Sequence, residues 1–398
     1  MKTYKFILLL TLILSVQAQR ATESLWDIQQ RCEQYGYPYE EHQVTTEDGY
    51  ILTLMRIPHG REDDNMENRE PVYMTHPISS SAESFTYLGP ENSPVFYIVN
   101  NGYDVWLNNF RGNIYSRNHE ELDFDTERKE FYDLDLIDLS QDHPANIQYI
   151  IDTTGYPQIH TFCFSLSGVA LAINMAIRPE FYESRLSEAV LIASPINMAN
   201  TNSPTYAILG NNPWIFAILR NLGIYEIFDR TPFHNLLMSI FCAPFAFFCI
   251  TSNEFTEGNS IYEVDNPRAY ALFMARGGMG MPRRALEHLV QSVRTQQVTY
   301  FDFGVQENME RYGTELPPRI PFENTRCPIA MLYGERDLVG DLVDAHWYAD
   351  QIEENIIFFD TYPYAHYSFL LARDPSVYLD DILDIYGNRP ISKSEESG

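Results

Sequence analysis

The chain has 398 residues, of which 45% are hydrophobic, so it can bury a large core in one domain with an insertion or in two domains. Its 27 Lys and Arg against 55 Asp and Glu give a formal charge of −28, which would repel a phosphate backbone and argues against a nucleic-acid partner. The acidity fits either a solvated anionic surface or service in an acidic compartment that neutralises part of the charge.

The first residues have the composition of a secretory signal peptide. Lys2 and Lys5 precede an apolar run over 6–16, and small residues lead to a cleavage site after Ala18. The run is too short to span a bilayer. We therefore expect a signal peptide over 1–18, no transmembrane segment, and a secreted protein or one delivered to the lysosomal lumen.

The chain contains five cysteines, and an odd number in a secreted chain predicts at least one free thiol or an intermolecular bridge. Cys242 and Cys249 are the nearest pair and could form a disulfide. No C-x-x-C motif or Cys/His cluster has the spacing of a zinc site, so no metal is expected.

Strand and helix patterns alternate over the first half of the chain. Residues 44–60 predict a β-hairpin around an Asp-Gly turn, 71–81 a strand that leads into a Ser-rich loop, and 93–113 a helix, an Asn-Gly turn and a strand. A helix follows over 135–155 and ends at Gly155. The segment HTFCFSLSGVA (160–170) then predicts a strand that stops at Ser165 and continues as a helix, and 186–196 predicts another buried strand.

This alternation predicts an α/β fold whose mostly parallel central sheet is covered by helices on both faces. It is interrupted over 200–326, where apolar helical stretches dominate, and it returns at 327. We therefore expect a core built from 19–199 and 327–390, an inserted helical cap over 200–326, and a disordered tail over 391–398. The uncharged run over 240–250 fits a buried cap helix or a wall or lid of an apolar substrate site.

Ser165 lies in a segment that nearly matches the nucleophile-elbow motif G-x-S-x-G, with Cys163 and Ser167 in place of the two glycines. A serine hydroxyl becomes a nucleophile only beside a base that an acidic residue orients. Downstream, Asp337 follows the apolar strand in PIAMLYGERD, and His366 follows a later strand. Asp341 and Asp344 are rivals of Asp337, but their spacing suits the exposed face of the next helix.

A helical position for His346 leaves His366 as the candidate base. The arrangement also needs two N–H groups that would bind an oxyanion. We expect these from Leu166, at the start of the helix after the serine, and from Ile78, because Pro77 in the early THPISSS loop has no N–H.

With these residues identified, the chain resembles the acid lipase family over about residues 24 to 387. The segments on which this resemblance is based are GYPYEEHQVTTEDGYILTLMRIPHG, NNGYDVWLNNFRGNIYSRNH, YGERDLVG and YPYAHYSFLLARDPSVY. The resemblance implies an α/β-hydrolase core and a cap over a hydrophobic pocket. It also implies nucleophile, acid and base at Ser165, Asp337 and His366, and hydrolysis of triacylglycerols or sterol esters without a cofactor.

The chain departs from this family at positions near the expected site. Where the family has glycine, this chain has Cys163, Ser167 and Pro77. Asn108 and Phe110 replace a usual Gly and a usual Ser. Two hypotheses follow: a serine ester hydrolase that acts on lipid esters at a lipid–water interface without an obligate protein partner, or a catalytically impaired lipid-binding or carrier protein on the same fold. The retained Ser, His and Asp favour the enzyme.

Overall fold

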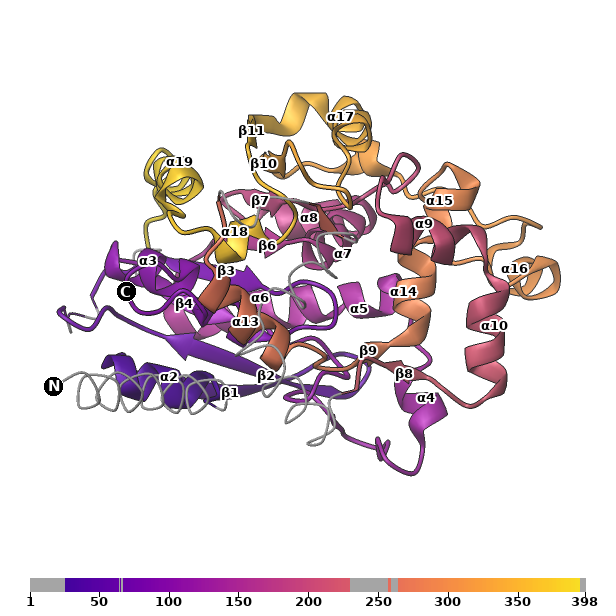
Figure 1. Cartoon of the computed structure of the whole chain (residues 1–398), viewed down its shortest axis with the longest axis horizontal. Coiled ribbons are helices and arrows are strands. Elements are labelled where there is room, and N and C mark those ends of the chain that lie inside the picture. The colour runs from indigo at the N-terminus through magenta and orange to yellow at the C-terminus, as the bar shows by residue number, and fades with distance from the viewer. Residues whose placement is uncertain (1–25, 64, 66, 230–256, 259–263, 394–398) are drawn as a thin grey trace, which may run out of the picture.

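The computed structural model describes residues 26–63, 65, 67–229, 257–258 and 264–393 (Figure 1). The predicted signal peptide, the apolar run over 240–250 and the Cys242–Cys249 pair lie outside these residues. Of the predicted tail, only 391–393 is described.

A mixed β-sheet forms the centre of the molecule, in the order β1-β2-β4-β3-β6-β7-β10-β11, with β5 paired to β2. The six strands from β4 to β11 run parallel to their neighbours, whereas β1 and β2 are antiparallel, as are β2 and β4. The predicted mostly parallel sheet is therefore confirmed. The strands are β1 (Glu40–Thr45), β2 (Tyr50–Ile57), β3 (Pro71–Thr75), β4 (Asp104–Leu107), β5 (Asn118–His119), β6 (His160–Phe164), β7 (Ala189–Ile192), β10 (Ile329–Gly334) and β11 (Ile356–Tyr362).

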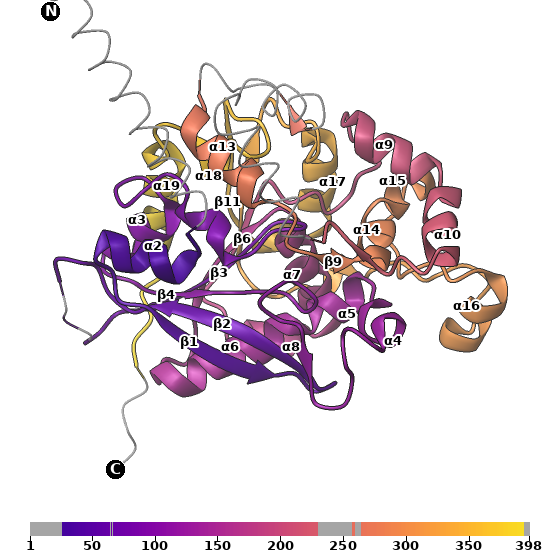
Figure 2. The ribbon, with the colours of Figure 1, turned by 60° about the horizontal axis from the view of Figure 1, so that its bottom comes forward.

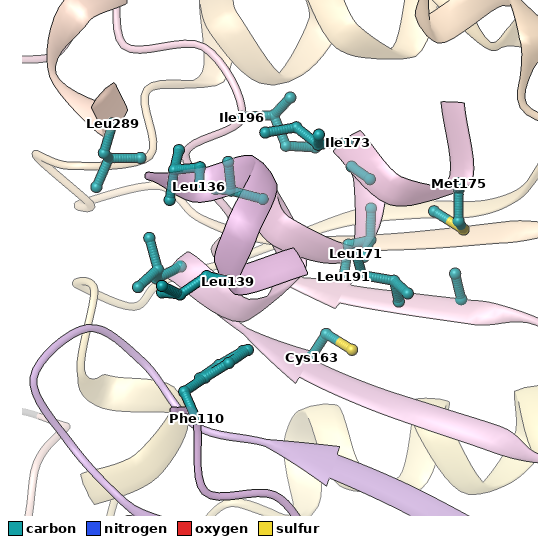
Figure 3. Packing of buried hydrophobic residues seen from close by; sticks show 14 of the residues in the cluster. Phe110, Leu136, Leu139, Cys163, Leu171, Ile173, Met175, Leu191, Ile196 and Leu289 are labelled. Atoms are coloured by element: carbon teal, nitrogen blue, oxygen red, sulfur yellow. The ribbon is translucent and has the colours of Figure 1, made fainter. Parts of the chain in front are cut away.

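Helices cover both faces of this sheet and enclose two hydrophobic cores. Alternate residues of a strand point to opposite faces, so in β6 Cys163 packs into one core while Phe162 and Phe164 pack into the other. Figure 3 shows part of the first core, where Cys163 lies near side chains of the helices and Leu191 of β7. The first core receives α5 (Leu136–Ser140), α6 (Asp142–Thr154), α7 (Leu166–Ile177), α8 (Pro179–Glu183) and α17 (Leu342–Gln351), and the second receives α2 (Ile28–Tyr35), α3 (Pro94–Asn100), α18 (Ser368–Leu371) and α19 (Ser376–Gly387).

Two predicted local elements are observed with one difference. The hairpin over 44–60 forms as β1 and β2 around the Asp48-Gly49 turn, where Gly49 has φ +91°. The single helix predicted over 135–155 is two helices, α5 and α6, joined at Gln141, and Gly155 ends the second at φ +75°. Pro144 has no N–H to donate to the carbonyl of Ser140, as a continuous helix would require, and it lies in the first turn of α6, where that N–H is not needed.

Helices also dominate the described part of 200–326. Figures 1 and 2 show α9, α10, α14, α15 and α16 gathered on one side of the sheet, at the right in both views. The two-residue strands β8 and β9 form a small antiparallel ladder that the sequence did not suggest. The elements are α9 (Pro204–Asn211), α10 (Trp214–Asn221), β8 (Glu226–Ile227), α13 (Pro267–Arg276), β9 (Met281–Pro282), α14 (Arg283–Leu289), α15 (Gln291–Thr295) and α16 (Val305–Tyr312).

The remaining elements are the short helix α4 (Arg128–Tyr132) and three 3₁₀ turns over Ala82–Thr86, Phe322–Asn324 and Glu353–Asn355. In the described ranges, no helix has the length and apolar character needed to cross a membrane.

Candidate active site

The loops that carry the predicted site residues meet at one edge of the sheet. Parallel strands end at the same edge, and open α/β sheets bind ligands at the carboxyl ends of their strands. Ile78 follows β3, Ser165 follows β6, Asp337 follows β10 and His366 follows β11. The topology therefore brings together residues that lie almost 300 positions apart in the chain.

Ser165 occupies a strained turn between β6 and α7. Its φ of 61° and ψ of −123° lie in a region that non-glycine residues rarely adopt. The neighbouring chain holds this conformation, since the Ser165 N–H donates to the carbonyl of Ile192 at 2.9 Å. The turn fixes the hydroxyl at the edge of the sheet.

The side chains of Ser165, His366 and Asp337 form a hydrogen-bonded row. Ser165 Oγ lies 2.8 Å from His366 Nε2, and His366 Nδ1 lies 2.7 Å from Asp337 Oδ2. The second oxygen, Asp337 Oδ1, accepts the N–H groups of Val339 at 2.7 Å and Gly340 at 3.0 Å. All three members of the row are buried. The carboxylate is thus held in one orientation toward the imidazole.

The environment of His366 raises its pKa above the ordinary value. Burial favours the neutral imidazole and lowers the pKa, but the adjacent Asp337 charge and hydrogen bond outweigh it, and the charge of Glu257 adds to them. This imidazole is therefore a stronger base than a free histidine, and it accepts a proton more readily from a neighbouring hydroxyl.

The replaced glycines of the elbow are accommodated by specific contacts. Ser167 Oγ lies 2.9 Å from the carbonyl oxygens of both Thr75 and Phe164, which share its one hydroxyl proton, and this ties the start of α7 to two strand ends. The tightest approach is one residue later: a Cβ on Gly168 would lie 1.9 Å from Ser194 Oγ. The sequence has its glycine where the fold leaves no room for a side chain.

The loop after β3 is held by His76. His76 Nδ1 lies 2.8 Å from the carbonyl of Pro77, and Nε2 accepts the backbone N–H of Phe110 and the amide of Asn113, both at 3.2 Å. Burial lowers the pKa of His76 to about 4, so the ring is neutral and can accept these bonds. Positive φ in this loop falls on Ser79, at 50°, and the conformation demands nothing that Pro77 cannot adopt.

The two predicted oxyanion donors lie on segments next to the serine: Leu166 follows it directly, and the pairing of Thr75 with Cys163 brings the end of β3 beside the end of β6. Leu166 is the first residue of α7, where a backbone N–H has no acceptor within the helix. Ile78 lies in the loop that His76 organises, and its side chain lines a cavity of about 370 Å³. Their role as donors to an oxyanion remains a prediction.

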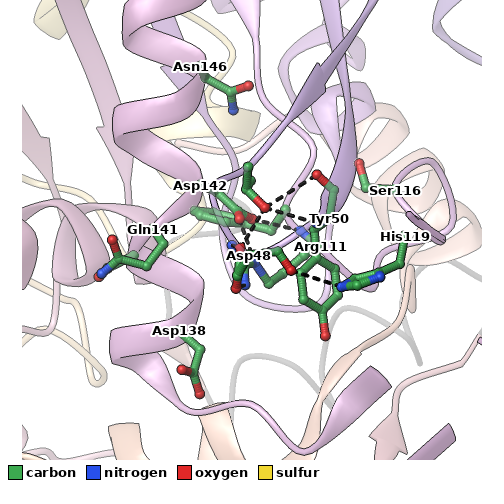
Figure 4. A network of polar contacts seen from close by, with 12 residues as sticks. Asp48, Tyr50, Arg111, Ser116, His119, Asp138, Gln141, Asp142 and Asn146 are labelled. Carbon is green, nitrogen blue, oxygen red and sulfur yellow. Dashed lines mark hydrogen bonds and ion pairs between the residues drawn. The ribbon is translucent and has the colours of Figure 1, made fainter. Parts of the chain in front are cut away.

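A buried ionic network supports the loop after β4 (Figure 4). Arg111 binds the Asp142 carboxylate through Nε at 2.6 Å and its backbone N–H at 2.8 Å, and its guanidinium also contacts Asp48 in the β1–β2 turn. Burial raises the pKa of Asp142 to about 6, opposed by the Arg111 charge. Because Phe110 precedes Arg111 and donates to His76, this network also positions the loop that carries Ile78.

The rivals of Asp337 have other roles. Asp341 caps α17 by accepting the N–H of Val343 at 2.8 Å, and His346 is exposed within the same helix. The expectation that Asp344 lies on the exposed face of that helix is wrong. Asp344 is buried and accepts the backbone N–H and the side-chain amide of Asn200, which spacing along one helix could not reveal.

Glu257 is a feature of the site that sequence reasoning missed. Its backbone carbonyl accepts the N–H groups of His366 at 3.3 Å and Leu338 at 3.4 Å, so it joins the two loops of the row. Glu257 lines the same cavity as Ile78, and burial raises the pKa of its carboxyl to about 7. No local pattern around residue 257 marks it, because its role depends on segments more than 80 residues away.

Three cysteines lie within the described ranges, and Cys32, Cys163 and Cys327 are all buried free thiols. This agrees with the prediction of at least one free thiol. Burial raises the pKa of Cys163 to about 12, so it behaves as a small apolar residue behind the serine. Within the same ranges, no three His, Cys, Asp or Glu side chains are grouped so as to hold a metal ion.

Comparisons with known proteins give the relationship of this chain. Residues 28–89 match the family described as a partial alpha/beta-hydrolase lipase region. The chain is 30% identical over 368 residues to human "Lipase member K", covering 91% of each sequence, and 27% identical over 361 residues to rat "Gastric triacylglycerol lipase", covering 88% and 89%.

Among solved structures, an alpha/beta hydrolase fold protein from Nakamurella multipartita is similar with a TM-score of 0.52. The match covers 87% of this chain and 98% of that protein's chain. Because the two sequences are only 11% identical, the match shows the fold alone. The extent and identity of the lipase matches decide the family. This chain belongs to the acid lipase family and has the α/β-hydrolase fold.

Proposed function

We propose that the protein is a serine hydrolase of lipid esters, with Ser165 as nucleophile, His366 as general base and Asp337 as the residue that orients the imidazole. The observation that carries this proposal is the hydrogen-bonded row of 2.8 Å and 2.7 Å at the carboxyl edge of the sheet. The named lipases among its relatives support an ester as the substrate.

The chemistry follows from the row. His366 removes the hydroxyl proton as Ser165 Oγ attacks the ester carbonyl, and the imidazolium that forms is stabilised by Asp337. The N–H groups of Ile78 and Leu166 would bind the negative oxygen of the tetrahedral intermediate, each contributing about 3 kcal/mol. The imidazolium of His366 then gives its proton to the leaving alkoxide, which departs as the alcohol, and water hydrolyses the acyl-enzyme by the same steps.

The substrate class and location belong to the same proposal. Triacylglycerols suit the name of the gastric relative, and triacylglycerols or sterol esters presented at a lipid–water interface suit the apolar lining of the cavity beside Ile78. A secreted or lysosomal location agrees with the gastric relative and with the N-terminal sequence pattern.

Hydrolysis of short- and long-chain nitrophenyl esters by wild type, Ser165→Ala and Ser167→Ala tests the proposal. We expect Ser165→Ala to lose more than 10³-fold in kcat. Ser167→Ala removes a nearby hydroxyl whose bonds, within the described ranges, go to backbone carbonyls, and it should retain turnover and labelling by a fluorophosphonate. Equal rates for wild type and Ser165→Ala would contradict the mechanism and favour a lipid carrier.

A further inference from the structure

Glu257 places a second carboxyl group beside the proposed catalytic row. The residue is 6% exposed, and its Oε2 atom is buried without a hydrogen-bond partner among the described residues. Buried polar atoms are almost always satisfied, and an ionised oxygen without a partner destabilises the fold. An unused acceptor in a cavity wall therefore points to a ligand that donates a hydrogen bond.

The position of Glu257 is fixed by its backbone. Besides the bonds that its carbonyl receives from His366 and Leu338, the next residue packs tightly against the chain before Asp337. Gly258 has φ +108°, and a Cβ there would lie 2.2 Å from the carbonyl oxygen of Arg336. Only glycine allows this approach, so the carboxyl is carried at a defined place next to the imidazole loop.

The cavity that Glu257 lines is otherwise mostly apolar. Leu209, Phe273 and Leu286 contribute to its walls. It contains a second carboxylate, Asp229, but Arg117 neutralises that group through a contact of 2.9 Å. Among the described residues that line this cavity, Glu257 is the acidic residue with a carboxyl oxygen that has no hydrogen-bond partner.

The chemistry of ester cleavage indicates which half of the substrate meets Glu257. His366 must protonate the leaving alkoxide, so the alcohol half of the ester lies beside the imidazole. The backbone carbonyl of Glu257 accepts the N–H of His366, and the negative charge of the Glu257 carboxylate raises the pKa of the imidazole. A hydroxyl a few atoms from the ester oxygen would therefore come within reach of the carboxyl.

We propose that the Glu257 carboxyl accepts a hydrogen bond from a free hydroxyl on the alcohol half of the substrate, so that the enzyme prefers partial glycerides to esters that lack such a hydroxyl. This inference rests on the proposed ester hydrolase function. Near neutral pH both forms of Glu257 are populated, since its pKa is raised to about 7, mainly by burial. Both forms have an oxygen that can accept the bond.

The test compares the 2-hydroxyethyl and propyl esters of the same fatty acid, which are similar in size and differ in the hydroxyl. We expect wild type to favour the hydroxyethyl ester about tenfold or more in kcat/KM, the usual effect of one hydrogen bond to a charged group. Glu257→Leu should lower this ratio to about one, whereas Glu257→Gln, which keeps an acceptor oxygen, should retain part of it.

Asp229→Asn is the matched control, because it removes the other carboxylate of the cavity and should leave the ratio as in wild type. A wild-type ratio near one would overturn the inference even if Glu257→Leu fails to fold, and so would an unchanged ratio in a folded Glu257→Leu. Wild type that hydrolyses neither ester would instead refute the proposed function.

Discussion

His143 offers a quantitative test of the burial beneath the proposed site. It lies in α6, fully buried, with its ring 5.9 Å from that of Tyr73 and 5.4 Å from that of Phe110. Its pKa is lowered from 6.5 to about 3, mainly by burial; the nearby His76 also lowers it, and the Ser167 backbone opposes both. The folded protein therefore keeps this imidazole neutral at pH values where the unfolded chain protonates it.

The energetic consequence follows from proton linkage. A group whose pKa is lowered on folding contributes stability that is present above its unfolded pKa and is lost as pH falls. At pH 5 the unfolded chain has gained about 2 kcal/mol by protonating a histidine with a pKa of 6.5. In the folded protein, His143 stays almost unprotonated at pH 5 for any pKa well below 5. The expected change in the free energy of unfolding therefore does not depend on how far below 5 that pKa lies.

The experiment compares urea unfolding of wild type and His143→Gln between pH 8 and pH 5, followed by tryptophan fluorescence. The wild-type pH dependence alone is not diagnostic, because Asp142, with its pKa raised to about 6, gains stability as pH falls. Subtracting the free energies of unfolding of the two proteins cancels this contribution. From pH 8 to pH 5, we expect wild type to lose about 2 kcal/mol of stability relative to His143→Gln.

His346→Gln, which removes an exposed histidine from α17, controls for the loss of a histidine as such. A constant difference between wild type and His143→Gln at every pH would refute the reasoning. It would mean that water or a proton reaches the imidazole in the folded state.

Three further predictions concern the site and its supports. Gly168→Ala should destabilise the protein by roughly 1–3 kcal/mol in urea unfolding, because the added Cβ would lie 1.9 Å from Ser194 Oγ; an unchanged midpoint would contradict the close packing. Arg111→Met should cost about 3–5 kcal/mol at pH 8, since it leaves the buried Asp142 carboxylate without the cation that it contacts, and a melting temperature equal to that of wild type would count against this. If the proposed mechanism holds, kcat/KM should fall tenfold per pH unit below the raised pKa of His366, and a pH–rate profile without an acid limb would exclude this imidazole as the base.

Local signals in the sequence were sufficient for several elements. The Asp48-Gly49 turn predicted the hairpin, and Gly155 predicted the end of α6, because each needs a backbone conformation that glycine adopts easily. The strand that stops at Ser165 was likewise visible as an apolar run followed by small residues. These features depend on a few neighbouring residues, which is why they could be read without the fold.

Other features depend on contacts between distant segments. Asp344 was expected on a helix surface, but Asn200 covers it, and nothing in the helix itself shows that neighbour. Glu257 lies between the loops of Leu338 and His366 only after the sheet has brought those loops together. The assignment of Ser165, Asp337 and His366 used sheet topology as an intermediate step, which let the sequence indicate residues that meet only in three dimensions.

The departures from the family pattern near Ser165 do not argue for a disused site. In a pocket without selection on its geometry, larger side chains would be expected to displace the turn and separate the hydroxyl from the imidazole. Here Ser167 bonds two strand ends, Cys163 faces the core behind the turn, and Phe110 packs its ring 5.1 Å from that of His76. These three residues pack or bond within the segments in which they lie, and Ser165 Oγ remains 2.8 Å from His366 Nε2. Substitutions that retain this distance change how the turn is held and leave the proposed chemistry available.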